Sequence, residues 1–286
     1  MIVEETTIGR VLTRSSGFLR DVCSHSLQPY QGCTHGNSLC GVSCYVRHNR
    51  WLTKGREWGS FLEARMNAAE AYTAEHSREQ RWARRSRNGL VIFLSSSTDP
   101  FVPQERRLGL TAAVLAAMVD SPPDGLILQT HSPTVAEHFA VLQELHSRCD
   151  LRVQISVESD QERLPGLPAP IATVGARLAA AAKLHDAGLQ VIICVAPLHP
   201  IAHPQAFFER ISHCASQVIV DHFIGGDGTP DGRRTLATAL PAAMAKVDPV
   251  SVELSYRDRM VDIACAVMPG RVGVSMDGFA GRWLES

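Results

Sequence analysis

Three cysteines stand within twelve residues of one another in the first fifth of this sequence. They are Cys33, Cys40 and Cys44, and their spacing is C-x6-C-x3-C. Thiolates are the usual ligands of iron–sulfur clusters, and three of them on a glycine-containing loop can hold three irons of a [4Fe–4S] cluster, which leaves the fourth iron open. Zinc is the alternative, with His35 or His48 as a further ligand, although zinc sites usually contain close pairs such as C-x2-C. The spacing alone leaves both metals open.

The other five cysteines are scattered along the chain, at positions 23, 149, 194, 214 and 265. The first residues are acidic and show no apolar signal segment, so we expect a cytoplasmic protein whose cysteines stay reduced. Cys194 lies within an apolar run and is expected to be a small core residue. Because no other three cysteines are close in sequence, we expect no second cluster.

A glycine-rich loop with two arginines is the second candidate site. It covers residues 221–235 and contains Gly226, Gly228, Arg233 and Arg234. Glycines let a backbone approach a ligand closely. The arginines are expected at the start of a helix, where backbone N–H groups and the guanidinium fork both favour phosphate, so the loop is a candidate substrate site. The alternative is a surface turn, which runs of Gly, Pro and Asp often form.

Short apolar runs alternate with helical segments through the rest of the chain. We predict strands at 90–94, 125–129, 151–157, 190–195, 218–221 and 250–254, and helices at 57–87, 104–119, 133–147, 174–187, 203–214 and 235–246, with a last helix and strand after them. Such alternation predicts βαβ units and a parallel sheet. We therefore expect an α/β fold, a partial (β/α)6-type TIM barrel made by one domain over residues 1–286, with the cysteine loop at 30–48 and the later strands and substrate loop at 216–286.

Polar or small residues follow nearly every predicted strand, at 95–99, 129–132, 158–160, 197–199 and 221–227. Parallel α/β folds bind their ligands at the carboxyl ends of the strands. The cysteine loop also follows a candidate strand region. The sequence thus predicts that the metal ligands and these polar residues lie together at the carboxyl ends of the strands. We call this region the mouth.

Composition excludes several classes of protein. Hydrophobic residues make up 45% of the 286 residues and charged residues 20%, which excludes a disordered or collagen-like chain. The 28 basic and 29 acidic residues give a net charge of −1, so a nucleic acid is a possible partner but not the favoured one, and we expect no membrane partner. No apolar run reaches the ~20 residues of a membrane span.

One basic stretch is interpreted as the solvated end of a helix and not as a nucleic-acid patch. It contains Trp82 and five arginines at 78, 81, 84, 85 and 87, and three glutamates at 70, 75 and 79 precede or interrupt it. Cations are favourable at the carboxyl end of a helix, where they complement the helix dipole.

The residues around the cysteine loop resemble a known family. The segment PYQGCTHG at 29–36, with Cys44-Tyr45 at the end of the loop, is similar to the cluster loop of radical S-adenosylmethionine (radical SAM) enzymes, in the branch related to spore photoproduct lyase. The resemblance continues in order through MNAAE at 66–70, STDPFVPQE at 97–105 and THS at 130–132, and extends over roughly residues 28 to 215.

The resemblance implies a set of ligands. Cys33, Cys40 and Cys44 would hold a [4Fe–4S] cluster whose open iron binds S-adenosylmethionine, and an external electron donor such as flavodoxin or ferredoxin would reduce it. Cleavage of the cofactor would give a 5′-deoxyadenosyl radical that abstracts hydrogen from the substrate. The cofactor-binding residues would be Ser96, Ser97, Thr98 and Asp99 near the methionyl amino group, and His131, Ser132, Ser156 and Glu158 along its ribose or carboxylate side.

The sequence departs from the family pattern in three places. Its loop has three extra residues between the first two cysteines and one between the last two. Ser43 stands where the family has an aromatic residue, so the adenine contact would pass to Val42 or Tyr45. His131 stands where the family has a lysine.

We therefore expect a radical SAM enzyme that acts on a small, phosphorylated or nucleotide-like substrate in natural-product biosynthesis. Sulfur insertion into a nucleotide sugar ring is a variant of that expectation. A DNA photoproduct lyase-like repair enzyme is the first alternative, but the lyase branch has a cysteine hydrogen donor where this chain offers only Ser95, Ser96 and Ser97. A zinc-stabilised, non-enzymatic barrel is the second.

Overall fold

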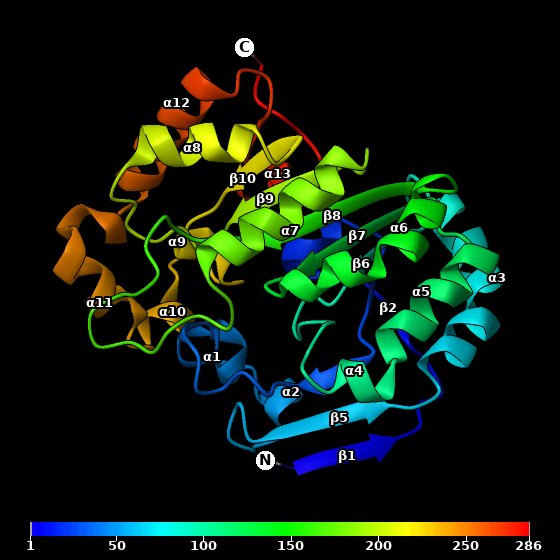
Figure 1. Ribbon diagram of the computed structural model, residues 1–286. Helices are drawn as coiled ribbons and strands as arrows, with labels where there is room; N and C mark the ends of the chain where they lie inside the picture. The colour runs from blue at the N-terminus through cyan, green and yellow to red at the C-terminus, as the bar shows by residue number, and fades with distance from the viewer. Residues whose placement is uncertain (1, 286) are drawn as a thin grey trace.

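The computed structural model describes residues 2–285 and contains a large sheet of eight strands in the order β11-β10-β9-β8-β7-β6-β3-β2 (Figure 1). The strands are β2 (Leu12–Arg14), β3 (His25–Leu27), β6 (Val91–Leu94), β7 (Gly125–Thr130), β8 (Asp150–Ser156), β9 (Val191–Val195), β10 (Gln217–Val220) and β11 (Val272–Val274). Neighbours are parallel except β2 and β3, which are antiparallel. The predicted α/β fold with parallel strands is confirmed.

The sheet is open, with β11 and β2 at its edges, and the strands described here form no closed barrel. The finer prediction of a partial (β/α)6 barrel therefore stays a prediction. So does the prediction of one domain over residues 1–286, whose two end residues lie outside the described range.

Helices cover one face of the large sheet, as Figure 1 shows. They are α3 (Ala68–Ser86), α5 (Leu110–Asp120), α6 (Phe139–His146), α7 (Val174–Asp186), α8 (Pro204–Ser212) and α12 (Leu254–Val267). Between them and the sheet lies the largest apolar core, to which β9 contributes Val191, Ile193 and Val195. The residues between these, Ile192 and Cys194, face a second core on the opposite side of the sheet. An all-apolar strand such as β9 is expected where a parallel sheet is covered on both faces.

That second core is closed by two short helices from the ends of the chain. They are η1 (Gly17–Asp21) and α13 (Ser275–Phe279), and they bring Phe18, Leu19 and Phe279 against the sheet. Cys194 is fully buried there, which confirms that it is a core residue.

A separate three-stranded sheet carries the cysteine loop. Its order is β1-β5-β4, made by β1 (Ile2–Thr6), β5 (Phe61–Arg65) and β4 (Tyr30–Gly32). The cysteine loop follows β4 and contains α1 (Leu39–Ser43), η2 (Tyr45–His48) and α2 (Arg50–Thr53). The prediction of one helix over 57–87 is wrong in its first part, because Phe61, Leu62 and Ala64 are buried in this sheet and the helix begins only at Ala68.

Short helices complete the chain and divide two of the predicted helices. They are α4 (Glu105–Leu108), η3 (Pro133–His138), α9 (Phe223–Gly226), α10 (Arg233–Leu236), α11 (Leu240–Val247) and η4 (Pro249–Val252). The helix predicted at 104–119 is divided at Gly109, whose φ of 62° suits glycine. The helix predicted at 235–246 is divided before Leu240.

The strand predicted at 250–254 is wrong. Asp248 accepts a hydrogen bond from the Val250 N–H at 3.0 Å and caps η4, and Pro249 has no N–H to give to a sheet. A helical turn therefore forms where the apolar composition favoured a strand. None of the helices within residues 2–285 has both the length and the apolar character of a membrane crossing.

Candidate functional site

The three cysteines of the loop lie at or beside the short helix α1. Cys33 directly follows β4 and is buried, Cys40 is the second residue of α1, and Cys44 ends that helix. The His35 N–H donates to the Cys33 sulfur at 3.3 Å. All three are free cysteines, and Cys40 and Cys44 are half-buried. The loop therefore places three unoxidised thiols within a few turns of backbone.

The pKa values of these thiols show that they share one environment. Burial raises the pKa of Cys33 to about 12, with the Cys44 charge as a further cause. Burial raises the pKa of Cys40 well above its ordinary value, and the charges of Cys44, Cys33, Glu158 and Asp99 raise it further. Burial also raises the pKa of Cys44, to about 11. The thiols thus lie close to one another and to the carboxylates at the strand ends, and a cation placed among them would favour their thiolate forms.

The residues of the cysteine loop are the candidates for holding a metal. Within residues 2–285, no three His, Cys, Asp or Glu side chains are arranged as a ready metal cage. The chemistry of the donor set nonetheless suits an iron–sulfur cluster, because the three cysteines of the loop offer sulfur donors only.

A charged cluster occupies the carboxyl ends of β6, β7 and β8. His131 Nε2 lies 3.0 Å from Glu158 Oε1, and its Nδ1 lies 3.7 Å from Asp99 Oδ2. The Arg177 guanidinium, which comes from α7, donates to Glu158 Oε2 at 2.7 Å and to the Ser156 carbonyl at 2.6 Å. The sequence-predicted residues Asp99, His131, Ser156 and Glu158 are thereby brought together.

Backbone and hydroxyl donors fix Asp99 in this cluster. Its Oδ1 accepts from the Thr130 hydroxyl at 2.8 Å and from the Phe101 N–H at 2.9 Å, and its Oδ2 accepts from the His131 N–H at 2.7 Å. Asp99 thus joins the loop after β6 to the end of β7. The bond to Phe101 also shows the turn role that a residue before proline often has.

The cluster sets fixed charges at the mouth. Burial by itself would lower the pKa of His131, but the Asp99 and Glu158 carboxylates outweigh it and raise that pKa to about 9. Burial by itself would raise the pKa of Glu158, but Arg177 and His131 hold it well below its ordinary value. At neutral pH the cluster therefore contains two anions and two cations. His131 supplies a positive charge at the position where the family has a lysine.

The remaining predicted cofactor-binding residues lie on the loops after β6 and β7, and most of them form hydrogen bonds with nearby residues. The Thr98 hydroxyl donates to the Gly32 carbonyl at 2.8 Å and so ties the loop after β6 to the cysteine loop. Gln28 donates to the Ser96 hydroxyl at 2.9 Å, and the Ser132 hydroxyl accepts from the Thr134 N–H at 3.3 Å at the start of η3. Ser97 is half-buried on the same loop. Ser132 is therefore a cap, while Thr98 connects the two halves of the site.

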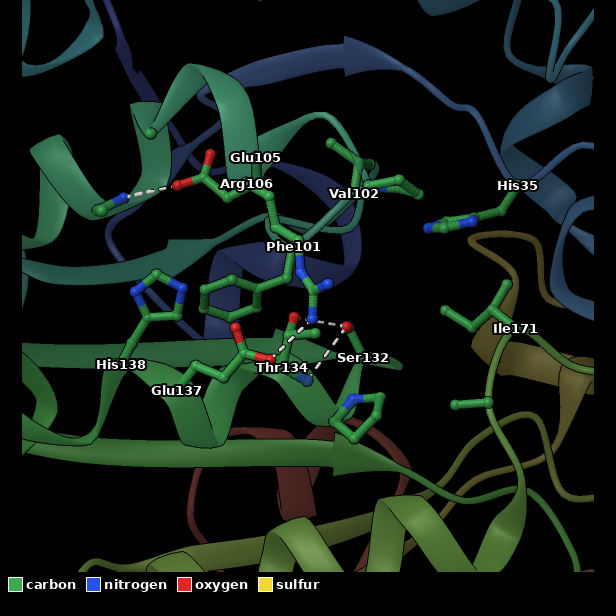
Figure 2. Close-up of a pocket in the computed structure, with 15 residues that line it drawn as sticks. His35, Phe101, Val102, Glu105, Arg106, Ser132, Thr134, Glu137, His138 and Ile171 are labelled. Carbon is green, nitrogen blue, oxygen red and sulfur yellow. Dashed lines mark hydrogen bonds and ion pairs between the residues drawn. The ribbon is translucent and has the colours of Figure 1, made fainter.

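A cavity of about 630 Å³ adjoins this cluster and is drawn in Figure 2. His35 points toward it from the cysteine loop, Phe101 and Arg106 line it after β6, and Ser132 and Thr134 line it after β7. His35 Nε2 is buried there without a hydrogen-bond partner. A buried ring nitrogen that has no partner within the protein is available to bind a polar ligand in the cavity.

The predicted substrate loop lies on the other side of the mouth. Arg234 donates to the Asp227 carbonyl at 3.2 Å, and a Cβ at Gly228 would lie 2.8 Å from its guanidinium, so the glycine leaves room for that side chain. Arg233 is exposed. The helix that these arginines begin has four residues, too short to provide the helix dipole on which the prediction of phosphate binding relied.

Asp227 organises this loop from within. Its carboxylate accepts from the Thr229 N–H at 2.9 Å and from the Thr235 N–H at 2.8 Å, and the Thr229 hydroxyl also donates to it. These donors fold residues 227–235 into a closed turn. The loop is thus an ordered structure, with Arg234 half-buried toward Tyr45, whose pKa is raised to about 12 first by burial.

Two functional candidates lie within the polar strand-end segments of the sequence but were not singled out as site residues. Asp221 directly follows β10, is 4% exposed, and accepts a hydrogen bond from the Ser275 hydroxyl. A Cβ at Gly226 would lie 2.4 Å from Asp221, so only glycine fits over this carboxylate. His199, which follows β9, is buried with an unpartnered Nε2, and burial lowers its pKa to about 4. Asp221 directly follows an apolar strand, and His199 stands four residues after the end of one, so position near a strand end was the available signal.

No protein-family model matches the chain, and no curated protein matches it. Solved structures of spore photoproduct lyase match its fold. One complexed with dinucleoside spore photoproduct has a TM-score of 0.65 and 13% identity, covering 95% of this chain and 81% of that one. A cysteine-to-serine variant gives 0.62 at 15% identity over 95% and 81%. A double variant with bound AdoMet and the same dinucleoside gives 0.61 at 14% identity over 96% and 81%.

Proposed function

We propose that this chain is a radical SAM enzyme, with Cys33, Cys40 and Cys44 as the ligands of a [4Fe–4S] cluster. The observation that supports it most is the meeting of two regions: the Thr98 hydroxyl, after β6, donates to the carbonyl of Gly32, directly before Cys33, at 2.8 Å. Besides burial, the Glu158 and Asp99 charges also raise the pKa of the Cys40 thiol. The fold likeness to spore photoproduct lyase over 95% of the chain supports the same proposal. When bound, the cluster and S-adenosylmethionine would supply one-electron cleavage of a carbon–sulfur bond.

The charged cluster would receive the polar end of S-adenosylmethionine. An amino acid carries one ammonium and one carboxylate, and the mouth offers fixed charges of both signs. In this proposal Asp99 faces the ammonium, and His131 faces the carboxylate, as the family's lysine would. Thr98 and Ser96 position the loop between them, and Glu158, held by Arg177 at 2.7 Å, orients the His131 ring. Tyr45, directly after Cys44, is the proposed adenine contact.

For the substrate we propose a small phosphorylated or nucleotide-like molecule bound on the β10 side, with Arg234 facing its phosphate and Gly226 and Gly228 letting the loop close over it. Arg233, being exposed, would act at the rim. A reduced electron carrier such as flavodoxin or ferredoxin is the proposed partner, and the cytoplasm the proposed location. The order that Asp227 gives to the loop supports a binding role over a plain surface turn.

A lyase acting on a DNA photoproduct is the second candidate. It is supported by the neighbours' own ligand, since three of the similar structures are described as holding dinucleoside spore photoproduct. Replacement of the lyase branch's cysteine by serines at 95–97 argues against it. Incubation of the reduced protein with S-adenosylmethionine and this dinucleoside separates the candidates, because release of repaired dinucleoside would favour the lyase.

Replacing a loop cysteine tests the proposal. Cys40→Ala should abolish the iron and sulfide bound after anaerobic reconstitution and the formation of 5′-deoxyadenosine from S-adenosylmethionine, because three thiolates are needed to hold the cluster. Iron and sulfide analysis, absorbance near ~400 nm, where clusters of this type absorb, and chromatography of the nucleoside product are the measurements.

Cys149→Ala and Cys214→Ala are the matched controls, since both lie away from the loop, and both should keep iron and activity. A Cys40→Ala protein with full iron would contradict the ligand assignment. Colourless wild-type protein loaded with zinc would contradict the radical mechanism and favour the zinc-stabilised barrel. Candidate nucleotides are added in a second series, in which a rise in 5′-deoxyadenosine identifies the substrate class.

A further inference from the structure

Five arginines gather on a face that the proposed function does not use. They are Arg10, Arg14, Arg78, Arg81 and Arg85, and all five are exposed. We call this surface the arginine face. Arg10, Arg14 and Arg78 line a hollow of about 540 Å³ between the edge strand β2 and helix α3. The hollow connects the strand and the helix into one continuous basic surface.

Helical spacing places the other two arginines beside that hollow. Residues 78, 81 and 85 are separated by three and four positions and so share one side of α3. Trp82 lies between them, with the Arg14 guanidinium 3.9 Å above its ring. This contact, together with Arg78 in the hollow, shows that Trp82 and Arg78 face β2, and Arg81 and Arg85 continue the row of Arg78 along the exposed side of α3.

The arginine face lies away from the candidate site. Helix α3 ends at Ser86 and the chain enters β6 at Val91, so Arg81 and Arg85 lie toward the amino-terminal end of that strand. The cysteine loop and the charged cluster lie at the carboxyl ends. A ligand held by Arg81 and Arg85 would therefore bind away from the mouth, whereas Arg10, which precedes β2, lies toward the carboxyl end of β3.

The charges on this face are not balanced. Glu75 and Glu79 are buried beneath it, and they pair with Arg78 at 3.0 and 2.8 Å and, from Glu79, with Arg14 at 3.0 Å. Within residues 2–285, Arg10, Arg81 and Arg85 form no ion pair. Five arginines against two glutamates leave a net charge of +3, on a chain whose total is −1.

Ordinary structural roles account for only part of this gathering. The helix dipole favours the cations of the last turn, Arg84 and Arg85, but acts neither on Arg10 and Arg14 nor on Arg78 two turns earlier. Charges on an edge strand discourage pairing with other chains, which explains Arg14 alone. Like charges three and four residues apart, as in Arg78, Arg81 and Arg85, weaken a helix by themselves.

The chemistry of the face fits phosphate. Every cation in it is arginine, whose planar fork binds phosphate through two parallel hydrogen bonds. Cations spaced along a groove between a helix and a strand can meet successive phosphates of a polymer, whereas one small anion would engage only part of the set. We propose that the arginine face binds the phosphodiester backbone of a nucleic acid, without base-specific contacts, as a property separate from the mouth chemistry.

Fluorescence anisotropy with a labelled 20-base-pair DNA duplex and a matching RNA duplex, from 50 to 200 mM salt, tests the proposal. The plot of log affinity against log salt should have a slope of about −0.9 for each phosphate contacted. The double variant Arg81→Gln/Arg85→Gln should reduce the magnitude of that slope by about 2. The ratio of the affinity of the unchanged protein to that of the variant should therefore fall roughly tenfold between 50 and 200 mM salt. The duplex that binds more tightly, DNA or RNA, identifies the kind of nucleic acid.

Arg163→Gln/Arg210→Gln is the matched control, because both residues are exposed and belong to other surfaces. It should leave affinity and slope unchanged, and circular dichroism should show both variants folded. The proposal is overturned if neither duplex binds, or if binding is lost with Arg234→Ala and kept with the α3 variant, which would place the nucleic acid at the mouth. Tighter direct binding of labelled polyglutamate than of either duplex would overturn it in favour of an acidic protein.

Discussion

At the carboxyl ends of β6 and β8, Asp99 and Glu158 each face a cation, whereas at the end of β10 Asp221 faces only a serine hydroxyl. His131 and Arg177 keep Glu158 ionised, and the same His131 lies 3.7 Å from Asp99. No Lys or Arg between residues 2 and 285 forms an ion pair with Asp221, and burial raises its pKa to about 6. Carboxylates at equivalent strand ends therefore differ in whether they can change charge near neutral pH.

This difference suits the two sides of the mouth to two kinds of ligand. A side with permanent charges suits a zwitterionic cofactor that must be held in one orientation. A side with a single titratable carboxylate suits a ligand whose hydrogen bonds change during binding or reaction. Ser275 strengthens this distinction, because it keeps a φ of 47°, unusual for a residue other than glycine, with its hydroxyl on Asp221.

Removing Arg177 should have the largest effect on stability. Arg177→Met keeps the apolar bulk but leaves Glu158 buried with His131 alone, and breaking a buried pair on one side costs about 3–5 kcal/mol. We expect a loss near the lower end of that range in urea unfolding. Arg148→Met is the control, because its pair with Glu144 is half exposed and should contribute less than about 0.5 kcal/mol. Equal losses in the two variants would contradict the contrast between the sides.

His131 should make stability depend on pH in the alkaline range. Its pKa is raised from 6.5 to about 9 by Asp99 and Glu158 against the effect of burial, so the folded state holds this proton more tightly than the unfolded chain. The resulting stability, roughly 2–3 kcal/mol, is fully present below pH 6.5 and lost as the pH rises through 9. His131→Gln should therefore cost most near pH 6 and much less near pH 10. A cost independent of pH would show that His131 is not charged.

Asp221 should act in the opposite direction and in a lower pH window. Its pKa is raised from 3.8 to about 6, so the ionised form is disfavoured in the folded state, and this destabilises the protein by roughly 3 kcal/mol above pH 6 and by nothing below pH 3.8. Asp221→Asn should be more stable than the unchanged protein at pH 7.5, and the gain should disappear toward pH 4.

Ser275→Ala sharpens this last test. The Ser275 hydroxyl lowers the pKa of Asp221, so its removal should move the transition to higher pH. An Asp221→Asn variant less stable than the unchanged protein at pH 7.5 would show that the carboxylate is needed in its ionised form, and the two sides of the mouth would then be alike.

Local sequence was sufficient to predict those elements that have a clear hydrophobic pattern and a residue, such as a helix cap, that marks where the element begins or ends. The strand predicted at 190–195 and the helix at 174–187 differ from β9 and α7 by a residue at most at either end, because an all-apolar run and a Thr173 cap leave little choice. The first part of the helix predicted at 57–87 failed for the opposite reason. Phe61–Arg65 has no strong preference of its own, and pairing with β1 and β4 makes it a strand.

The sequence by itself determined which residues could bind a metal, since three free thiols in twelve positions are a property of the chain and not of its folding. It also determined that polar residues would meet at one mouth, because the carboxyl ends of parallel strands lie on one edge. The tertiary structure decided what charge each carboxylate carries. Arg177 reaches Glu158 from nineteen residues away and Ser275 reaches Asp221 from fifty-four, and a pKa depends on such distances and on burial, which no local pattern contains.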